Sequence, residues 1–286
     1  MRVSTSAFRL RLRASLLALI LLFTLRGIAA GQAPATPTLD ALVRQLQDNA
    51  WDYRTNVPDF FADEHVVSTM KQEGAREVKT TSDSIFRLVR SHEIGETHNL
   101  TESREIKLVN KKPATSSNLQ GPAVFTGGFS TAPIIVSLEM SHCFDYALEE
   151  PTPLDKQRMP PDRQRMLLIS YTITDEGLHD ESCPGPEKQS GRVFIDPETL
   201  RLVRFEMVIP NHKDVNNGRM LWRWSVDFAP VTLDNHQFWL PKTITSHSEA
   251  NSGAGVWEFT ATYSNYHKTE VRSRIVTEGE TTPPPR

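Results

Sequence analysis

Nine residues, MLWRWSVDF at positions 220–228, decide the fold of this chain. Large apolar side chains occupy every second position from Met220 to Phe228, and mostly polar or charged side chains lie between them. A period of two is typical of a β-strand in a sheet that buries one face. The stretch therefore predicts a strand with a buried aromatic face and a solvated opposite face.

Three further stretches show the same alternation and predict more strands. Their apolar faces carry Val203, Phe205, Met207 and Ile209; Trp257, Phe259, Ala261 and Tyr263; and Leu167, Ile169, Tyr171 and Ile173. Weaker strand patterns occur at residues 85–90, 103–109, 192–195 and 238–246. Short turn sequences and the lack of interleaved helical patterns favour antiparallel pairing over a parallel βαβ sheet.

One amphipathic helix precedes the strands, because Leu39, Leu42, Val43 and Leu46 recur at i, i+3, i+4 and i+7. It is expected to end before Pro58. Residues 134–140 fit either a short second helix or a buried strand. No repeat or linker divides the chain, so the patterns predict an α+β protein, mainly β, with a single β-rich domain at residues 31–276.

The N-terminus has the order of a secretory signal peptide. Residues 2–13 carry four arginines and no acidic residue, an apolar run fills residues 14–25, and Ala29 and Ala30 follow. A helix over that run would reach about 18 Å, against about 30 Å for the hydrocarbon core of a bilayer. This length favours a cleavable signal over an anchor, with cleavage near Ala30. We therefore expect a periplasmic or secreted protein without stable membrane insertion.

Charge and hydropathy exclude two classes of protein. The mean hydropathy of -0.41 excludes a multi-spanning membrane protein. Removal of residues 1–30 takes away five arginines and no acidic residue, which leaves 27 basic and 35 acidic residues and a net charge of -8. Such a charge disfavours nucleic acid as a partner. Residues 277–286, with three consecutive prolines, are predicted to be a disordered tail.

The two cysteines of the chain, Cys143 and Cys183, both lie in the part that would be exported. An even count in an oxidising compartment favours a disulfide. The bond would stabilise the fold by roughly 3–4 kcal/mol in the chain-entropy model. Neither cysteine has a C-x-x-C partner, so the pattern does not indicate a metal site.

No motif points to catalysis, a metal or a cofactor. The sequence lacks a Walker loop, a G-x-G-x-x-G fingerprint and an H-E-x-x-H pair, and its nine histidines are scattered. Residues 127–130, GGFS, are glycine-rich and end in Ser130, so a serine-type hydrolase remains a third hypothesis. A Gly-Gly turn before an apolar segment explains the same residues without catalysis. We therefore expect a non-catalytic protein.

The strongest remaining signal is the aromatic face of the sheet. Its candidate ligand-binding residues are Phe205, Met207, Trp222, Trp224, Trp257, Phe259 and Tyr263. Aromatic side chains dominate protein cores in general, so these residues fit a filled core. The alternative to this favoured interpretation is the lining of an apolar pocket on a curved sheet that is loosely covered by a helix.

Residues 191–199, GRVFIDPET, are followed by residues 202–206, LVRFE, and the later stretches 238–242, FWLPK, and 263–266, YSNY, complete a pattern. This pattern resembles the G-x-x-x-I/V-D-x-x-T…R hairpin, the W-L-P strand and the Y-x-x-Y ending of exported proteins similar to the LolA-like outer-membrane lipoprotein-sorting superfamily. The resemblance covers roughly the C-terminal hundred residues and the first helix.

The resemblance implies a curved open antiparallel sheet, or half-barrel, covered by one or two helices, in a LolA-like domain. Members of that superfamily carry lipoproteins or lipids between membranes or act as periplasmic sensors. No arginine here aligns with the one that anchors the helix in the carriers, so no functional residue is carried over. The leading hypothesis is an exported protein that binds a lipid or lipoprotein acyl ligand. The alternative is a cell-envelope interaction or sensor module with a filled core.

Overall fold

A computed structural model describes residues 37–90, 100–133, 135, 137–158, 165–214 and 217–269 of the chain. The predicted signal peptide at residues 1–30 and the predicted tail at residues 277–286 lie outside the described residues. Leu39 begins a compact unit that holds all the described helices and strands. Among the described residues, no helix combines the length and the apolar character needed to cross a membrane.

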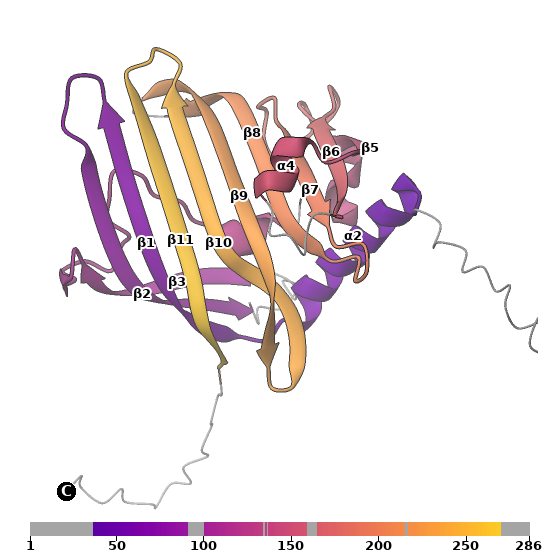
Figure 1. Cartoon of the computed structure of the whole chain (residues 1–286), viewed down its shortest axis with the longest axis horizontal. Coiled ribbons are helices and arrows are strands. Elements are labelled where there is room, and N and C mark those ends of the chain that lie inside the picture. The colour runs from indigo at the N-terminus through magenta and orange to yellow at the C-terminus, as the bar shows by residue number, and fades with distance from the viewer. Residues whose placement is uncertain are drawn as a thin grey trace, which may run out of the picture. The chain divides into compact units, whose positions relative to one another are not determined.

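The described strands form one antiparallel sheet, with the order β4-β3-β2-β1-β11-β10-β9-β8-β7-β6-β5 (Figure 1). The bounds are β1 Phe60–Gln72, β2 Val78–Arg90, β3 Leu100–Val109, β4 Lys112–Pro113, β5 Phe144–Glu149, β6 Leu167–Ile173, β7 Ser190–Ile195, β8 Leu202–Asp214, β9 Gly218–Leu233, β10 His236–Ala250 and β11 Gly255–Lys268. Because β1 pairs with β11, strands from the two ends of the chain are neighbours inside the sheet. The sheet is open, with β4 and β5 at its edges.

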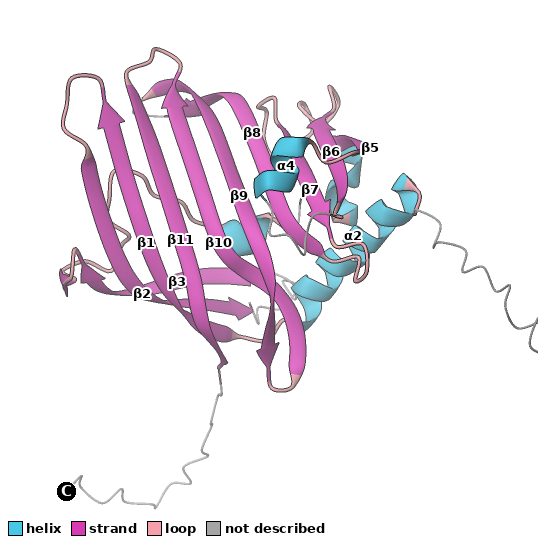
Figure 2. Cartoon of the chain, in the orientation of Figure 1, coloured by secondary structure: helices cyan, strands magenta, loops and turns pink. Residues whose placement is uncertain are grey.

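Helices are few and short, apart from one (Figure 2). The long helix α2 (Leu39–Asn56) packs the apolar stripe predicted from the sequence, with Leu42 and Leu46 buried, into the main core. The others are α3 (Gly128–Thr131), the 3₁₀ helix η2 (Leu138–Cys143) and α4 (Pro153–Arg158). In α4, Asp155 pairs with Arg192 of β7 at 3.0 Å.

The predicted fold class is confirmed, since the structure is mainly β with an open antiparallel sheet and a covering helix. The four strongest strand predictions fall on β6, β8, β9 and β11. The sequence patterns did not predict β1 or β5. Of residues 134–140, left open between helix and strand, those from Leu138 onward begin a 3₁₀ helix.

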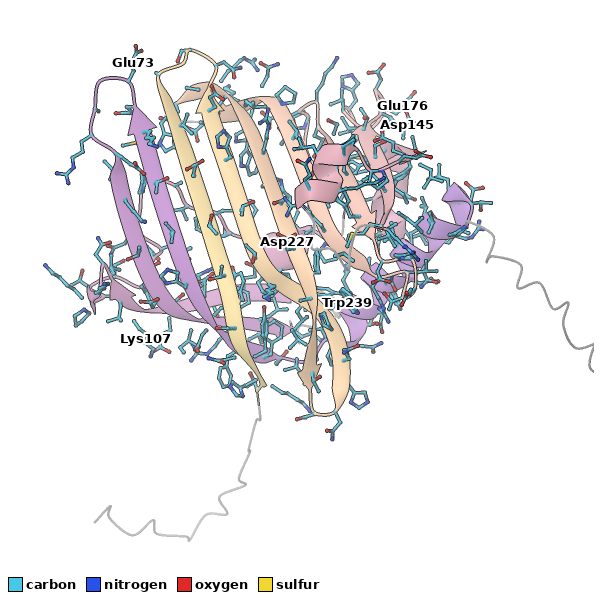
Figure 3. All side chains as sticks on the ribbon, in the orientation of Figure 1. Glu73, Lys107, Asp145, Glu176, Asp227 and Trp239 are labelled. Carbon is cyan, nitrogen blue, oxygen red and sulfur yellow. A yellow bond between two sulfur atoms is a disulfide. The ribbon has the colours of Figure 1, made fainter. Side chains whose placement is uncertain are left out.

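The two faces of the sheet differ as the alternation in β9 predicts. Trp224, Val226 and Phe228 point to the inner face and are buried in the main core. Asp227 points to the outer face, where it pairs with Arg204 of β8 at 2.7 Å (Figure 3). Packing of apolar side chains on the inner face is therefore the main source of stability for this sheet.

The predicted disulfide is present. Cys143 and Cys183 are bonded, with their Cα atoms 5.7 Å apart. The bond joins the start of β5 to the loop between β6 and β7, so it secures the edge of the sheet.

One long connection runs from the β4 edge of the sheet to the β5 edge. We call residues 114–137 the crossover segment; its residues 134 and 136 lie outside the described ones. It carries Phe125 and Phe129, both buried in the main core. In Figure 1, its helix α3 is seen behind β10. The crossover segment and α2 therefore both contribute side chains to the core inside the sheet.

Candidate functional site

A cavity of about 190 Å³ opens on the inner face of the sheet beside the crossover segment. An apolar protein cavity of about 150 Å³ already accommodates a benzene-sized group. The apolar part of the lining includes Phe125, Met220, Trp222, Trp257 and Phe259, and the polar part is His212, Asp214, Asn217, Ser246 and Ser248. The cavity is therefore large enough for one small apolar group and offers hydrogen-bonding groups beside it.

The cavity exists because β10 places small side chains between large ones. Ser248 pairs in register with Trp222 of β9 on one side and with Trp257 of β11 on the other. Ser246 lies between Trp224 and Phe259 in the same way, and its hydroxyl accepts a hydrogen bond of 2.8 Å from Trp222 Nε1. The two serines leave space that larger side chains would fill.

Phe125 of the crossover segment is one of the residues that line the cavity. Its ring centroid lies 5.1 Å from Trp224 and 6.2 Å from both Trp222 and Phe259. These separations are typical of aromatic pairs in contact. Phe125 therefore contacts both the aromatic residues that line the cavity and Trp224 of the main core.

The seven predicted ligand-binding residues divide into two groups. Trp222, Trp257 and Phe259 line the cavity, and Phe259, which is 2% exposed, also belongs to the main core. The others, Phe205, Met207, Trp224 and Tyr263, lie in the main core and are each at most 4% exposed. The inner face thus combines the two arrangements that the sequence left open, a filled core and a pocket at its margin.

The sequence analysis missed Phe125 and the two serines of β10. Phe125 lies in an irregular segment, so no periodicity indicated its position. In the structure, Ser246 and Ser248 of β10 lie in register with inward-facing aromatic residues of β9 and β11. Their significance depends on which strands flank β10, which the sequence alone does not reveal.

The carboxylate of Glu102 on β3 anchors the crossover segment. It accepts hydrogen bonds from the backbone N–H groups of Gly127 (3.0 Å), Phe129 (2.9 Å) and Ser130 (3.0 Å), and from the Ser130 hydroxyl (3.2 Å). Hydrogen bonds to a charged group are stronger than neutral ones. A second anchor is Ser68 of β1, whose hydroxyl donates to the Ala123 carbonyl (2.7 Å) and accepts from the Ala123 N–H (2.8 Å).

The two glycines before α3 let the crossover segment approach the sheet. Gly127 has φ +87°, a left-handed conformation that side chains disfavour. A Cβ atom on Gly128 would lie 2.5 Å from Ile244 Cδ1 of β10. The Gly-Gly pair is therefore explained by packing.

A buried polar cluster lies next to Glu102. Glu64 of β1 accepts hydrogen bonds from Arg104 Nε (2.9 Å), Tyr263 Oη (2.8 Å) and Ser84 Oγ (2.5 Å). Burial is the largest single influence on the pKa of Arg104 and lowers it, but the charge and hydrogen bond of Glu64, together with Tyr263 and the charge of Glu102, outweigh burial and raise this pKa. Burial and the Glu64 charge together raise the pKa of Tyr263 well above its usual value. The cluster holds Arg104 charged and Tyr263 neutral beneath the crossover segment.

Ser130 has structural partners. Its hydroxyl lies 3.2 Å from Glu102 Oε1 and 3.2 Å from the Gly127 carbonyl oxygen. Among the described residues, none of its hydrogen bonds involves a histidine, the base that usually activates a nucleophilic serine. These contacts explain Ser130 as part of the anchor around Glu102.

Comparison with known proteins found similar solved structures but no matching sequence family. A scan against family models found no match, and a search of curated proteins found no relative. Among solved structures, the LolA superfamily protein NE2245 from Nitrosomonas europaea matches at 12% identity and a TM-score of 0.33, over 82% of this chain and 97% of that chain. A DUF1329 family protein from Desulfovibrio piger matches at 11% identity and a TM-score of 0.33, over 81% of this chain and 95% of that chain.

A structure of lipid–protein interactions in lipovitellin matches at 10% identity and a TM-score of 0.29, over 77% of this chain and 26% of that chain. Matches with identities and TM-scores this low say nothing about activity, ligand or partner. The open antiparallel sheet with a helix against its inner face is nevertheless the architecture that the sequence resemblance to LolA-like proteins implies.

Proposed function

We propose that this protein is exported and binds an apolar ligand, a lipid or the acyl chain of a lipoprotein, on the inner face of its sheet without catalysis. The observation that carries the proposal is the cavity lined by Trp222, Trp257 and Phe259, whose further lining residue Phe125 also packs against Trp224 of the aromatic core. An acyl chain that enters the cavity would take the place of Phe125 against Trp224.

Replacement of Phe125 by an acyl chain is physically reasonable because both are apolar groups. Phe125 contributes apolar contacts to the sheet aromatics, and an acyl chain offers the same kind of contact, at about 25 cal/mol for each Å² removed from water. The backbone that must move is an irregular loop, so its displacement breaks no strand pairing. The hydrogen bonds at Glu102 and Ser68 oppose displacement and keep the site covered when no ligand is bound.

Export is supported by the disulfide between Cys143 and Cys183, because such bonds persist mainly in oxidising compartments. The charge and apolar pattern of residues 1–30 supports the same compartment. A carrier that works between membranes requires this location.

The second candidate is an interaction or sensor module with a permanently filled core. It is favoured by the complete burial of Phe205 and the near-complete burial of Trp224. Under this hypothesis the cavity is a packing defect, and Phe125 never leaves the core.

The test is binding of a fluorescent fatty acid to delipidated protein, with two variants on one strand. Ser248→Phe fills the cavity between the two tryptophans and is expected to weaken binding at least tenfold, about 1.4 kcal/mol. His247→Phe is the matched control, because the alternation of β10 puts this residue on the outer face, where it lies near Glu258. Phe125→Ala is expected to tighten binding, since it weakens the cover.

Binding by the parent that Ser248→Phe reduces and His247→Phe does not would support the proposal. Absence of binding by the parent, or equal effects of the two variants, would refute it and favour the interaction module.

A further inference from the structure

The lining of the cavity changes from apolar to polar towards the turn between β8 and β9. The β8 residues that pair in turn with Trp224, Trp222 and Met220 of β9 are Met207, Ile209 and His212. Asp214 ends β8, Asn217 directly precedes β9, and both line the cavity together with His212. We call His212, Asp214 and Asn217 the polar rim. The cavity therefore offers an apolar wall on one side and hydrogen-bonding groups on the other.

Glu187, from the loop between β6 and β7, fixes the histidine of the polar rim. Its carboxylate lies 2.7 Å from His212 Nδ1 and accepts a second hydrogen bond, of 2.7 Å, from the Lys213 N–H. Because an ionised carboxylate only accepts hydrogen bonds, Nδ1 is the donor in this pair, and Nε2 is the ring nitrogen that the pair does not use. The imidazole ring also packs against Trp222, with the ring centroids 4.7 Å apart. His212 is therefore held beside the indole before any ligand arrives.

The rest of the polar side is held in place in a similar way. Asp214 Oδ1 accepts hydrogen bonds from the Asn217 N–H (2.7 Å) and from Asn217 Nδ2 (2.9 Å), which fixes both side chains across the turn. Ser248 lies in register between the two tryptophans, and its hydroxyl can both donate and accept a hydrogen bond. Carboxylate, amide, imidazole and hydroxyl groups thus stand beside two indole rings.

The charge of the lining is unsuited to an anionic group. Among the described residues that line the cavity there is no lysine or arginine, the side chains that usually bind carboxylates and phosphates. Asp214 carries a negative charge there, and Glu187 offsets a positive charge on His212. An anionic head group would lose hydration and face a like charge. A neutral hydroxyl group donates to carboxylate and amide oxygens and accepts from serine, so it suits every polar group of the lining.

We propose that the ligand of this cavity is a neutral amphiphile whose head group carries several hydroxyls, as glycerol and sugars do. The polar rim and Ser248 bind the head group, and the first part of the acyl or alkyl chain packs against Trp222 and Trp257. This assignment rests on the proposed binding at the cavity and names the class of ligand. A fatty acid anion would bind through its chain alone and therefore more weakly.

The test is calorimetric titration of delipidated protein with laurate, monolaurin and dodecyl glucoside, each below its micellar concentration and at a pH that ionises laurate. The three ligands share the length of their chain and differ in the head group. Both neutral ligands are expected to bind roughly tenfold or more tighter than laurate, about 1.4 kcal/mol. The tighter of the two identifies glycerol or sugar as the head group.

Two variants of the polar rim test whether it causes this preference. Asp214→Asn removes the charge but keeps an oxygen that accepts from Asn217, so it should strengthen laurate binding and reduce the preference. His212→Phe keeps a ring against Trp222 and loses the hydrogen bonds, so it should weaken binding of the neutral ligands and change that of laurate little. The matched control is His65→Phe, since His65 also pairs with a carboxylate, Asp83 at 2.7 Å, but does not line the cavity.

The possible results separate this assignment from the proposed function. A preference for the neutral ligands that the rim variants reduce and His65→Phe does not would support it. Equal binding of all three ligands by the parent, tighter binding of laurate, or a preference that both rim variants retain would overturn it and leave the proposed function standing. Absence of binding by all three would overturn both. Circular dichroism follows the fold of each variant, and Asp214→Asn decides if His212→Phe does not fold.

Discussion

The inner face of the sheet is covered in two different ways. α2 covers one part with a row of buried apolar side chains, Leu42, Leu46 and Ala50, and the cleft between it and the sheet measures about 40 Å³. A second cleft of about 260 Å³ lies on the other side of α2, against residues 137–139. The crossover segment covers another part with Phe125 and Phe129, and it leaves a cavity of about 190 Å³. Both covers contribute to the same core.

The difference lies in what holds each cover in place. The helix satisfies most of its own backbone and is held by a continuous apolar stripe, with a few polar links to the sheet, such as Asn49 to the Leu200 carbonyl and Arg201 to Asp52. The crossover segment has little regular structure, so its backbone depends on side chains of the sheet, chiefly Glu102 and Ser68. Breaking a few hydrogen bonds would release the crossover segment from the sheet. We therefore expect ligand-dependent motion in the crossover segment and not in α2.

The largest expected difference in unfolding free energy is between alanine substitutions of two tryptophans on β9. Trp224 is 4% exposed and contacts both Phe205 and Phe125, so Trp224→Ala is expected to cost roughly 3–5 kcal/mol of unfolding free energy. Trp222 is only half-buried and faces the cavity, so Trp222→Ala should cost less than about 2 kcal/mol. Urea unfolding measures both; equal costs would mean that the cavity is closed in solution.

A smaller difference in unfolding free energy is expected between removal of an anchor of the crossover segment and removal of an anchor of α2. Glu102→Ala removes the acceptor of four hydrogen bonds and is expected to cost about 2–3 kcal/mol. The matched change on the helix side is Asn49→Ala, which removes a hydrogen bond of 2.7 Å to the Leu200 carbonyl and a weak one of 3.4 Å from Gln45 Nε2, and should cost about 1 kcal/mol. A cost for Asn49→Ala as large as that for Glu102→Ala would contradict the difference between the covers.

The smallest effect concerns tyrosine ionisation across both regions. Burial raises the pKa of all five tyrosines, to about 12 for Tyr146. Their contribution to stability is therefore complete below the unfolded value of about 10 and is lost as the pH rises from there towards the folded pKa. Tyrosinate absorbance should appear together with unfolding; ionisation of Tyr263 before unfolding would show that the crossover segment opens without ligand.

The sequence predicted the regular parts of this molecule well, for a physical reason. β9 and α2 bury one face each, so their apolar residues repeat with the period of the backbone. The disulfide followed from the number of cysteines and the expected compartment. β1 escaped prediction because its inner face mixes Glu64 and Ser68 with apolar residues, which obscures the alternation.

The cavity was only half predictable. Trp222, Trp257 and Phe259 were found because aromatic residues stand out on alternating strands. Phe125 and Glu102 were not, since their roles come from contacts between segments far apart in the chain, such as the hydrogen bonds between Glu102 and Gly127. Such contacts follow from topology and leave no local pattern in the sequence.

The most direct test of the central claim is hydrogen exchange at the two covers, with and without a saturating fatty acid. If the ligand displaces the crossover segment, the amides of Gly127, Phe129 and Ser130, which now donate to Glu102, should exchange faster in its presence. The amides of α2 should exchange at an unchanged rate. Unchanged or slower exchange at those three amides with bound ligand would contradict the account.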